Sequence, residues 1–225
     1  MAERSGFETS VPENAVPENA VVKPAGPELF VVEGRSAANA VRKVIDKATQ
    51  SVYAVQGKPM NVVKASQREI DANERVAELY RRIVRNRAEG FDPDPSPDAV
   101  PFDRVILLAD ADVDGVHAKA LLLVMIDAIL PDLVASEMLF TVRAPLFAVT
   151  CDQRSSPVFA YSPDGRQRVT AQLLEQGASG VESVHFKGIA SMNSDEIWES
   201  CLNPATRLMT PLTAEHVGAA RSALA

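Results

Sequence analysis

The chain has 225 residues, of which 46% are hydrophobic, 24% charged and 5% aromatic, and this composition is typical of a globular protein with one sizeable core. Its 23 lysines and arginines against 30 acidic residues give a formal charge of -7, which excludes the coating of nucleic acid by bulk charge, so any such contact must be local. Two cysteines, and three histidines at no ligand spacing to them, exclude a disulfide scaffold and a tetrahedral zinc site.

Proline-rich segments stand at the start and near the middle of the chain. Residues 1–26 contain the tandem pentapeptide VPENAVPENA, so we expect a disordered leader, and DPDPSPD at 92–98 predicts an acidic linker. The first ten residues lack the apolar core of a signal peptide, and the most apolar run, 118–130, is too short to span a bilayer. The sequence therefore predicts a cytoplasmic protein without membrane contacts.

Apolar runs alternate with helical periodicity through the first two-thirds of the chain. We expect strands at 29–33, 52–55, 105–110, 138–143 and 146–150, and helices at 36–47, 66–89 and 117–130. Further along, SPDG at 162–165 predicts a hairpin turn, and Ser194 predicts the cap of a last helix that ends before Asn203. Strands alternating with helices indicate an α/β fold with a mainly parallel sheet, in which ligands bind beyond the carboxyl ends of the strands.

Carboxylates gather at the expected ends of two of these strands. Glu33 ends the first strand, and DADVDG places Asp110, Asp112 and Asp114 two residues apart directly after the third. Alternate side chains of an extended backbone point to the same side, so we expect the aspartates to converge. Their mutual repulsion favours a bound divalent cation, and ligands that are all oxygen suit magnesium or calcium.

Two other interpretations of DADVDG are open to comparison. An EF-hand calcium loop begins in the same way, but it needs a glutamate at its twelfth position, where this chain has Leu121, and a helix before it, where this chain has VILLA. A solvated acidic turn is the simpler alternative. The presence of Glu33 at a second strand end is more than such a turn requires.

Six segments resemble, in order, the Toprim region of the B-type subunit of bacterial type IIA topoisomerases, DNA gyrase and topoisomerase IV. They are ELFVVEGRSA, QGKPMNVVKA, DRVILLADADVDGVHAKALLL, APLF, FKGIASMN and IWESCLNPATR, within residues 27–212. The glutamate and DxD strands alone indicate only Toprim, which primases and some nucleases share, whereas the other blocks are typical of the topoisomerase B type. The resemblance implies a Rossmann-like Toprim core at 27–150, a C-terminal hairpin-plus-helix extension of the topoisomerase region at 151–212 and a tail at 213–225.

The resemblance also implies catalytic roles for the carboxylates. Glu33 matches the family's acid/base glutamate, proposed to protonate the leaving 3′-oxygen in DNA cleavage and to take the proton back in religation. Asp110, Asp112 and Asp114, together with Glu33, match its magnesium ligands. These roles agree with the chemistry, because phosphoryl transfer between DNA and a tyrosine needs positive charge at the phosphate and a proton for the leaving alkoxide.

Four further residues are DNA-binding candidates by the same resemblance. Lys58, Asn61 and Lys64 match a stretch that lies along DNA near the break, and Lys187 matches the lysine of the family's KGLGEMN block. A turn lysine after Gly57 is the alternative interpretation of Lys58.

The chain departs from the family's motifs at several positions. The family's EGDSAGG reads EGRSAAN, so Arg35 replaces an aspartate, and the basic residue before Gly-Lys is Gln56. KGLGEMN reads KGIASMN, with Ala190 and Ser191 in place of glycine and glutamate. If the Arg35 guanidinium contacts the Glu33 carboxylate, it lowers the pKa of Glu33 and makes that residue a poorer proton donor.

These features lead to one expected function and two alternatives. We expect the magnesium-dependent half of a DNA cleavage-religation site, completed by the tyrosine of a separate A-type subunit. No segment resembles the family's ATPase domain, so any ATPase is expected on a separate subunit. The alternatives are a non-catalytic Toprim paralogue that binds DNA or a topoisomerase as a regulator, which Arg35, Gln56 and Ser191 favour, and a magnesium-dependent nuclease or phosphotransferase that works alone.

Overall fold

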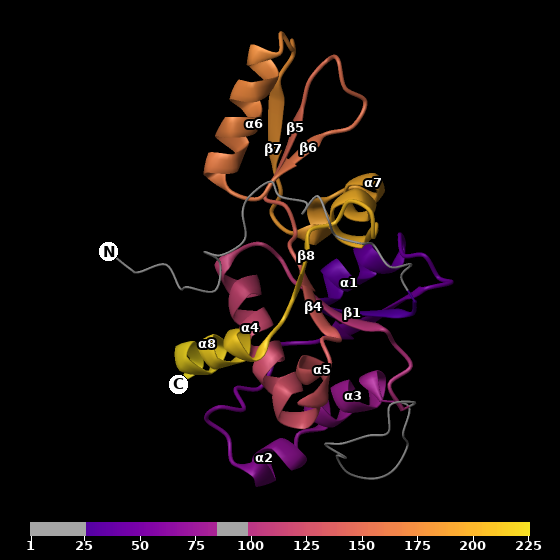
Figure 1. Cartoon of the computed structure of the whole chain (residues 1–225), viewed down its shortest axis with the longest axis vertical. Coiled ribbons are helices and arrows are strands. Elements are labelled where there is room, and N and C mark those ends of the chain that lie inside the picture. The colour runs from indigo at the N-terminus through magenta and orange to yellow at the C-terminus, as the bar shows by residue number, and fades with distance from the viewer. Residues whose placement is uncertain (1–25, 85–98) are drawn as a thin grey trace.

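A five-stranded sheet in the order β2-β1-β3-β4-β8 forms the centre of the larger part of the molecule (Figure 1). The computed structural model describes residues 26–84 and 99–225, so the acidic run at 92–98 and all but the last residue of the expected leader lie outside it. The strands are β1 (Glu28–Glu33), β2 (Gln50–Val55), β3 (Arg104–Leu108), β4 (Leu139–Val142) and β8 (Met209–Pro211). The first four run parallel and β8 is antiparallel to β4, which confirms the expected α/β fold with a mainly parallel sheet.

Helices cover both faces of this sheet, and residues 29–32 of β1 are all apolar because they alternate between the two covered faces. Leu29 and Val31 pack on one face against α3 (Glu74–Ile83), α4 (Val113–Ile129) and α8 (Ala214–Leu224). Phe30 and Val32 pack on the other face against α1 (Arg35–Arg42) and the segment from Ile189 to Leu202. That segment contains η2 (Ile189–Ser191), α7 (Ser194–Ile197) and η3 (Trp198–Leu202). In the described ranges no helix is long and apolar enough to cross a bilayer.

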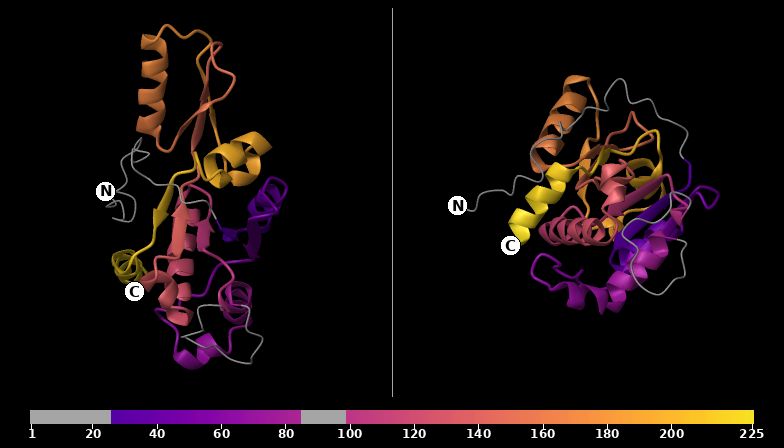
Figure 2. Two further views of the ribbon diagram at one scale, coloured as in Figure 1. Left: turned by 45° about the vertical axis from the view of Figure 1, so that its right-hand side comes forward. Right: turned by 60° about the horizontal axis from the view of Figure 1, so that its bottom comes forward.

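A smaller lobe projects from one end of the molecule, as Figure 1 and the left view of Figure 2 show. It consists of an antiparallel sheet in the order β6-β5-β7 and the helix α6. The bounds are β5 (Phe147–Thr150), β6 (Val158–Ala160), α6 (Pro163–Glu175) and β7 (Glu182–His185). A small core that includes Val149, Val169 and Leu173 joins the helix to the sheet.

The expected hairpin turn at 162–165 is wrong, because SPDG begins helix α6 instead. The Ser162 hydroxyl accepts a hydrogen bond from the Gly165 N–H at 2.9 Å, and Pro163 occupies the first helical position. Serine followed by proline is a helix-start signal because proline lacks only an N–H that the first helical turn leaves unused. The chain therefore passes from β6 through α6 to β7, and SPDG does not connect two strands as a hairpin turn.

Other boundaries also differ from the sequence-based expectation. The helix expected at 36–47 ends at Arg42, and Asn193 rather than Ser194 caps α7, because its side chain accepts a hydrogen bond from the Glu196 N–H. The single helix expected at 66–89 is split into α2 (Gln67–Asp71) and α3, because the Asn73 side chain accepts hydrogen bonds from two N–H groups and caps a new helix. Helix α4 begins at Val113 rather than His117. The segment expected as a tail forms α8, which packs against α4 (Figure 1), and a short α5 (Asp132–Ala135) follows α4.

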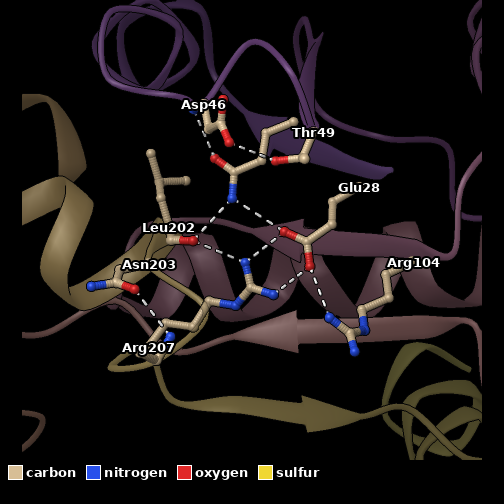
Figure 3. A network of polar contacts seen from close by, with 9 residues as sticks. Glu28, Asp46, Thr49, Arg104, Leu202, Asn203 and Arg207 are labelled. Atoms are coloured by element: carbon tan, nitrogen blue, oxygen red, sulfur yellow. Dashed lines mark hydrogen bonds and ion pairs between the residues drawn. The ribbon is translucent and has the colours of Figure 1, made fainter. Parts of the chain in front are cut away.

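A buried ion-pair network ties β1 to the chain's last third (Figure 3). The Glu28 side chain is 0% exposed and receives hydrogen bonds from both terminal nitrogens of Arg207, with 2.7 Å between Arg207 Nη1 and Glu28 Oε2. Arg104 Nη1 and Gln50 Nε2 donate to the same carboxylate at 3.1 Å and 3.2 Å. Arg207 Nη1 and Gln50 Nε2 also both donate to the Leu202 carbonyl at 3.0 Å.

The pKa of Glu28 is lowered by this network. Burial raises the pKa, but the hydrogen bond and charge of Arg207, with the hydrogen bonds of Arg104 and Gln50, outweigh it. The carboxylate is therefore charged at neutral pH, and the network joins the start of β1 to β2, to β3 and to the segment that leads into β8.

We expect Arg207→Met to lower the free energy of unfolding by about 3–5 kcal/mol, because it leaves the buried Glu28 carboxylate without its main counter-charge. The double variant Glu28→Gln/Arg207→Met should be less destabilised than Arg207→Met alone. Urea unfolding of the three proteins at pH 7 measures both effects. A double variant that is less stable than Arg207→Met contradicts this account of the network.

The same network sets the sign of a pH effect. The folded pKa of Glu28 is below its ordinary value of 4.5, so its contribution to stability is complete above that pH and is lost as the pH falls through the folded pKa. Urea unfolding at pH 7 and pH 3 should show a larger loss of stability on acidification for the wild type than for Glu28→Gln.

Candidate functional site

The candidate site lies at the carboxyl edge of the main sheet, where two neighbouring parallel strands end. Glu33 is the last residue of β1, and Asp110 follows β3 by two residues. Since β1 and β3 pair in parallel, their carboxyl ends meet at one edge. Gly34, with a φ of 83°, then turns the chain into α1. The sheet topology therefore brings Glu33 and Asp110 together, as the sequence predicts.

Four carboxylates at this edge act on one another electrostatically. Burial raises the pKa of Glu33, and the charges of Asp110, Asp112 and Asp114 raise it further. The pKa of Asp110 is also raised, first by burial and then by Asp112, while a hydrogen bond from the Ile189 N–H partly offsets this. We call these four residues the acidic cluster. Their mutual repulsion is of the kind that a bound cation relieves.

Asp110 is held in place by the backbone of the FKGIASMN segment. The Ile189 N–H donates to Asp110 Oδ1 at 2.7 Å, across 79 residues of sequence. Gly188 has a φ of 143°, and a Cβ atom there would lie 2.6 Å from Asp110 Oδ2. The Ser191 hydroxyl closes the same loop by donating to the Gly188 carbonyl at 2.7 Å. From this block the sequence analysis took only Lys187 as a site residue and missed the contact with Asp110, although the glycine after the lysine was a signal of a close approach.

The backbone of the three aspartates was expected to be extended throughout, but it is extended only as far as Asp112. The Asp112 side chain caps helix α4 by accepting a hydrogen bond from the Gly115 N–H at 2.8 Å, and Asp114 lies in the first turn of that helix. Both side chains are exposed. Within residues 26–84 and 99–225 no three side chains of His, Cys, Asp or Glu are grouped closely enough to hold a metal ion.

The donor chemistry of the cluster nevertheless fits magnesium. Mg²⁺ keeps several water ligands and is usually held by one or two carboxylates together with substrate phosphates, so a cage of three protein ligands is not required. Asp110 and Asp112 each use Oδ1 in the backbone contacts described above, while Oδ2 of each makes no hydrogen bond within the described ranges. These two residues, with Asp114 and Glu33 beside them, are the groups that could hold the ion.

The DNA-binding candidates have different surroundings. Lys58, Lys64 and Lys187 are exposed, the first two in the segment after β2 and the third beside Gly188. Asn61 is half-buried instead, and its Nδ2 donates to the Leu224 carbonyl at 3.0 Å while its Oδ1 accepts from the Val63 N–H at 3.1 Å. The Asn61 side chain thus anchors its own segment to the end of α8.

Arg35 does not act on Glu33 as hypothesised. Its Nη2 donates to Gln56 Oε1 at 2.7 Å, and Arg35 is absent from the charges that determine the pKa of Glu33. That pKa is raised rather than lowered, so the hypothesis is wrong. The residues at positions 35 and 56, which both depart from the family's motifs, therefore form a contact with each other.

Comparison with known proteins agrees with this geometry. Residues 28–141, about half of the chain, match the Toprim domain family. The chain belongs to this family. The Toprim match contains the whole acidic cluster and, except for Val142 at the end of β4, the four parallel strands of the main sheet, whose arrangement is the one expected for the fold.

Relatives of this Toprim protein extend the similarity beyond the matched domain. The B subunit of DNA gyrase from Archaeoglobus fulgidus is 30% identical over 192 residues, which is 85% of this chain and 29% of the relative. The B subunit of DNA topoisomerase 4 from Streptococcus pneumoniae is 30% identical over 198 residues, or 88% of this chain and 30% of the relative. The B subunit of DNA gyrase from Mycolicibacterium smegmatis is 30% identical over 204 residues, or 88% and 29%. The chain thus spans less than a third of the length of these relatives, and its resemblance to topoisomerase B subunits is confirmed.

Gly188→Ala should lower the stability of the Toprim protein by about 1–3 kcal/mol, because the φ of 143° is strained for a side chain and the new Cβ collides with the Asp110 carboxylate. Gly218→Ala is the matched control, since nothing lies within 4 Å of a Cβ there, and in a helix it should stabilise by about 0.5–1 kcal/mol. Thermal unfolding measures both. Equal effects of the two substitutions would contradict the close approach to Asp110.

Proposed function

We propose that this chain supplies the magnesium-dependent half of a DNA cleavage-religation site, which the tyrosine of a separate A-type topoisomerase subunit completes. The observation that carries the proposal is the acidic cluster at the carboxyl edge of the sheet, in a chain whose relatives are named as B subunits of DNA gyrase and topoisomerase 4. The similarity to these B subunits over most of the chain, together with membership of the Toprim family, supports a DNA topoisomerase role in general.

Each residue of the cluster has a part in the proposed reaction. As the tyrosine of the A-type partner, having lost its proton to solvent, attacks phosphorus through its phenolate oxygen and the bond to the 3′-oxygen breaks, Glu33 gives a proton to the leaving oxygen. In religation Glu33 takes that proton back while the 3′-oxygen displaces the tyrosine. Asp110 and Asp112, with Asp114 beside them, would hold the magnesium ion, whose charge stabilises the negative phosphate.

Other residues position these groups. The Ile189 N–H fixes the direction of the Asp110 carboxylate, and the Gly115 N–H does the same for Asp112. Lys58, Lys64 and Lys187 are exposed and carry the charge that DNA phosphates require. Their contacts with phosphate should weaken steeply with salt.

Three observations favour a second function, that of a non-catalytic regulator that binds DNA or a topoisomerase. Backbone N–H groups already occupy one carboxylate oxygen of Asp110 and one of Asp112, and the described ranges contain no group of three metal-ligating side chains. The substitution of Arg35 for the family's aspartate also favours the regulator. The two functions differ in whether DNA is cleaved.

Magnesium at about ten times its dissociation constant should raise the melting temperature of the full chain by about 3–5 °C over that in EDTA, because it relieves the repulsion within the cluster. The double variant Asp110→Asn/Asp112→Asn should lose this shift. Asp164→Asn, an exposed aspartate in the first turn of α6, is a control that should keep it. A wild-type melting curve that millimolar magnesium leaves unmoved contradicts the metal site.

When the chain is mixed with magnesium and a gyrase A-type subunit, it should convert supercoiled plasmid to linear DNA with protein attached. The amount of linear DNA is measured on gels after treatment with detergent and protease. Glu33→Gln should reduce the cleavage rate about 100-fold to 10,000-fold, since it removes the proton donor. Glu182→Gln, an exposed glutamate on β7, should cleave as the wild type does. No cleavage, with inhibition of a complete topoisomerase by the chain, would select the regulator instead.

A further inference from the structure

A pocket of about 470 Å³ lies against the outer edge of β2, apart from the acidic cluster. Strand β2 is the last strand of the main sheet and pairs only with β1, so its outer edge has no strand partner among the described residues. Helices α1 and α3, which cover opposite faces of the sheet, both reach this edge. We call it the β2-edge pocket; the polar residues that line it include Arg35, Asn39, Arg42, Ser51, Gln56 and Arg82.

Two arginines of α1 enter this pocket without an acidic partner. Arg35 Nη2 donates to Gln56 Oε1 at 2.7 Å, and Arg42 Nη1 donates to Asn39 Oδ1 at 3.1 Å. Both acceptors are neutral amides, and neither arginine forms an ion pair within residues 26–84 and 99–225. The amides thus orient the guanidinium groups without cancelling their charge.

A third arginine enters from α3 and is only loosely neutralised. Arg82 Nη2 lies 3.6 Å from Glu78 Oε1, and its guanidinium stacks 5.7 Å from the centre of the Tyr53 ring. Glu78 is the one acidic side chain among the described residues that line the pocket. Three arginines against one glutamate leave an excess of two positive charges in a chain whose total charge is -7.

This arrangement has the properties of a phosphate site. Guanidinium groups donate paired N–H bonds that match two oxygens of a phosphate, and such charge-assisted bonds are stronger than those to neutral groups. A terminal phosphate carries nearly two negative charges at neutral pH, as do two adjacent phosphates of a DNA backbone together. Either of them balances the excess charge of the β2-edge pocket.

We propose that the β2-edge pocket binds phosphate groups through Arg35, Arg42 and Arg82. The phosphates come from a DNA backbone or from a small phosphate-bearing molecule, and the chemistry of recognition is the same for both. The pocket uses none of the acidic cluster and needs no magnesium. The proposal is therefore independent of whether the chain takes part in DNA cleavage.

The test measures binding of two probes to the full chain in EDTA, so that the acidic cluster contributes no metal. One probe is inorganic pyrophosphate, followed by calorimetry, and the other is a fluorescent DNA duplex of about 20 base pairs, followed by anisotropy at several salt concentrations. The variant is Arg35→Gln/Arg42→Gln, which keeps hydrogen-bonding capacity at two exposed positions. The control is Arg81→Gln, which removes a charge from α3 outside the pocket, where Arg81 pairs with Glu74.

The double variant should bind at least one probe about 100-fold more weakly than the wild type, about tenfold for each lost guanidinium, while the control changes binding less than about threefold. Loss of pyrophosphate binding assigns the site to a small phosphate-bearing molecule. Loss confined to the duplex, with a salt dependence reduced by about two phosphate contacts, assigns it to a DNA backbone. The proposal is overturned if the wild type binds neither probe, or if the double variant and the control bind alike. Melting curves of all three proteins verify that the variants fold.

Discussion

The buried carboxylate of Glu28 is the constraint on which the main sheet depends. An unpaired charge in that position would cost several kcal/mol, so the chain has to bring Arg207, Arg104 and Gln50 to it. Those partners come from the segment before β8, from β3 and from the start of β2. Their convergence fixes the amino ends of three neighbouring strands. The opposite ends of β1 and β3, where Glu33 and Asp110 lie, are then fixed by strand length.

Most strands of the main sheet can be predicted from the sequence, because a parallel strand that is covered on both faces is a continuous apolar run. LFVVE and VILLAD therefore predict β1 and β3 to within one or two residues. The errors in the predicted element boundaries came from polar residues that can either lie in a turn or cap a helix. Asp112, Asn73 and Ser162 each fit a turn or a longer element, yet each caps a helix. The choice between a turn and a cap depends on which hydrophobic face is buried next, and the local sequence does not contain that information.

The candidate site was predictable to the same extent. Glu33 and Asp110 follow from the rule that parallel strands end at a common edge. The contact between Ile189 and Asp110 does not follow, because it crosses 79 residues and uses a backbone N–H that no side-chain motif marks. The direction in which the Arg35 side chain points could not be predicted from the sequence either. Its neighbour in sequence, Glu33, lies within two residues, but its partner in space is Gln56 on the adjacent strand end.

The span between Glu28 and Arg207 also has a consequence for biosynthesis. The two residues are 179 positions apart, and a ribosome that adds about 5–20 residues per second needs roughly 10–40 s to make that stretch. Arg104 emerges earlier, but until the interval ends the Glu28 carboxylate lacks Arg207, its main counter-charge, so β1 has to remain hydrated or be shielded. Helices α3 and α4 can pack early, but the sheet closes only when the residues that lead into β8 have emerged. The network around Glu28 is thus complete only after Arg207 has emerged, and a ribosome that stalls before Arg207 holds a chain in which β1 carries a carboxylate without its main counter-charge.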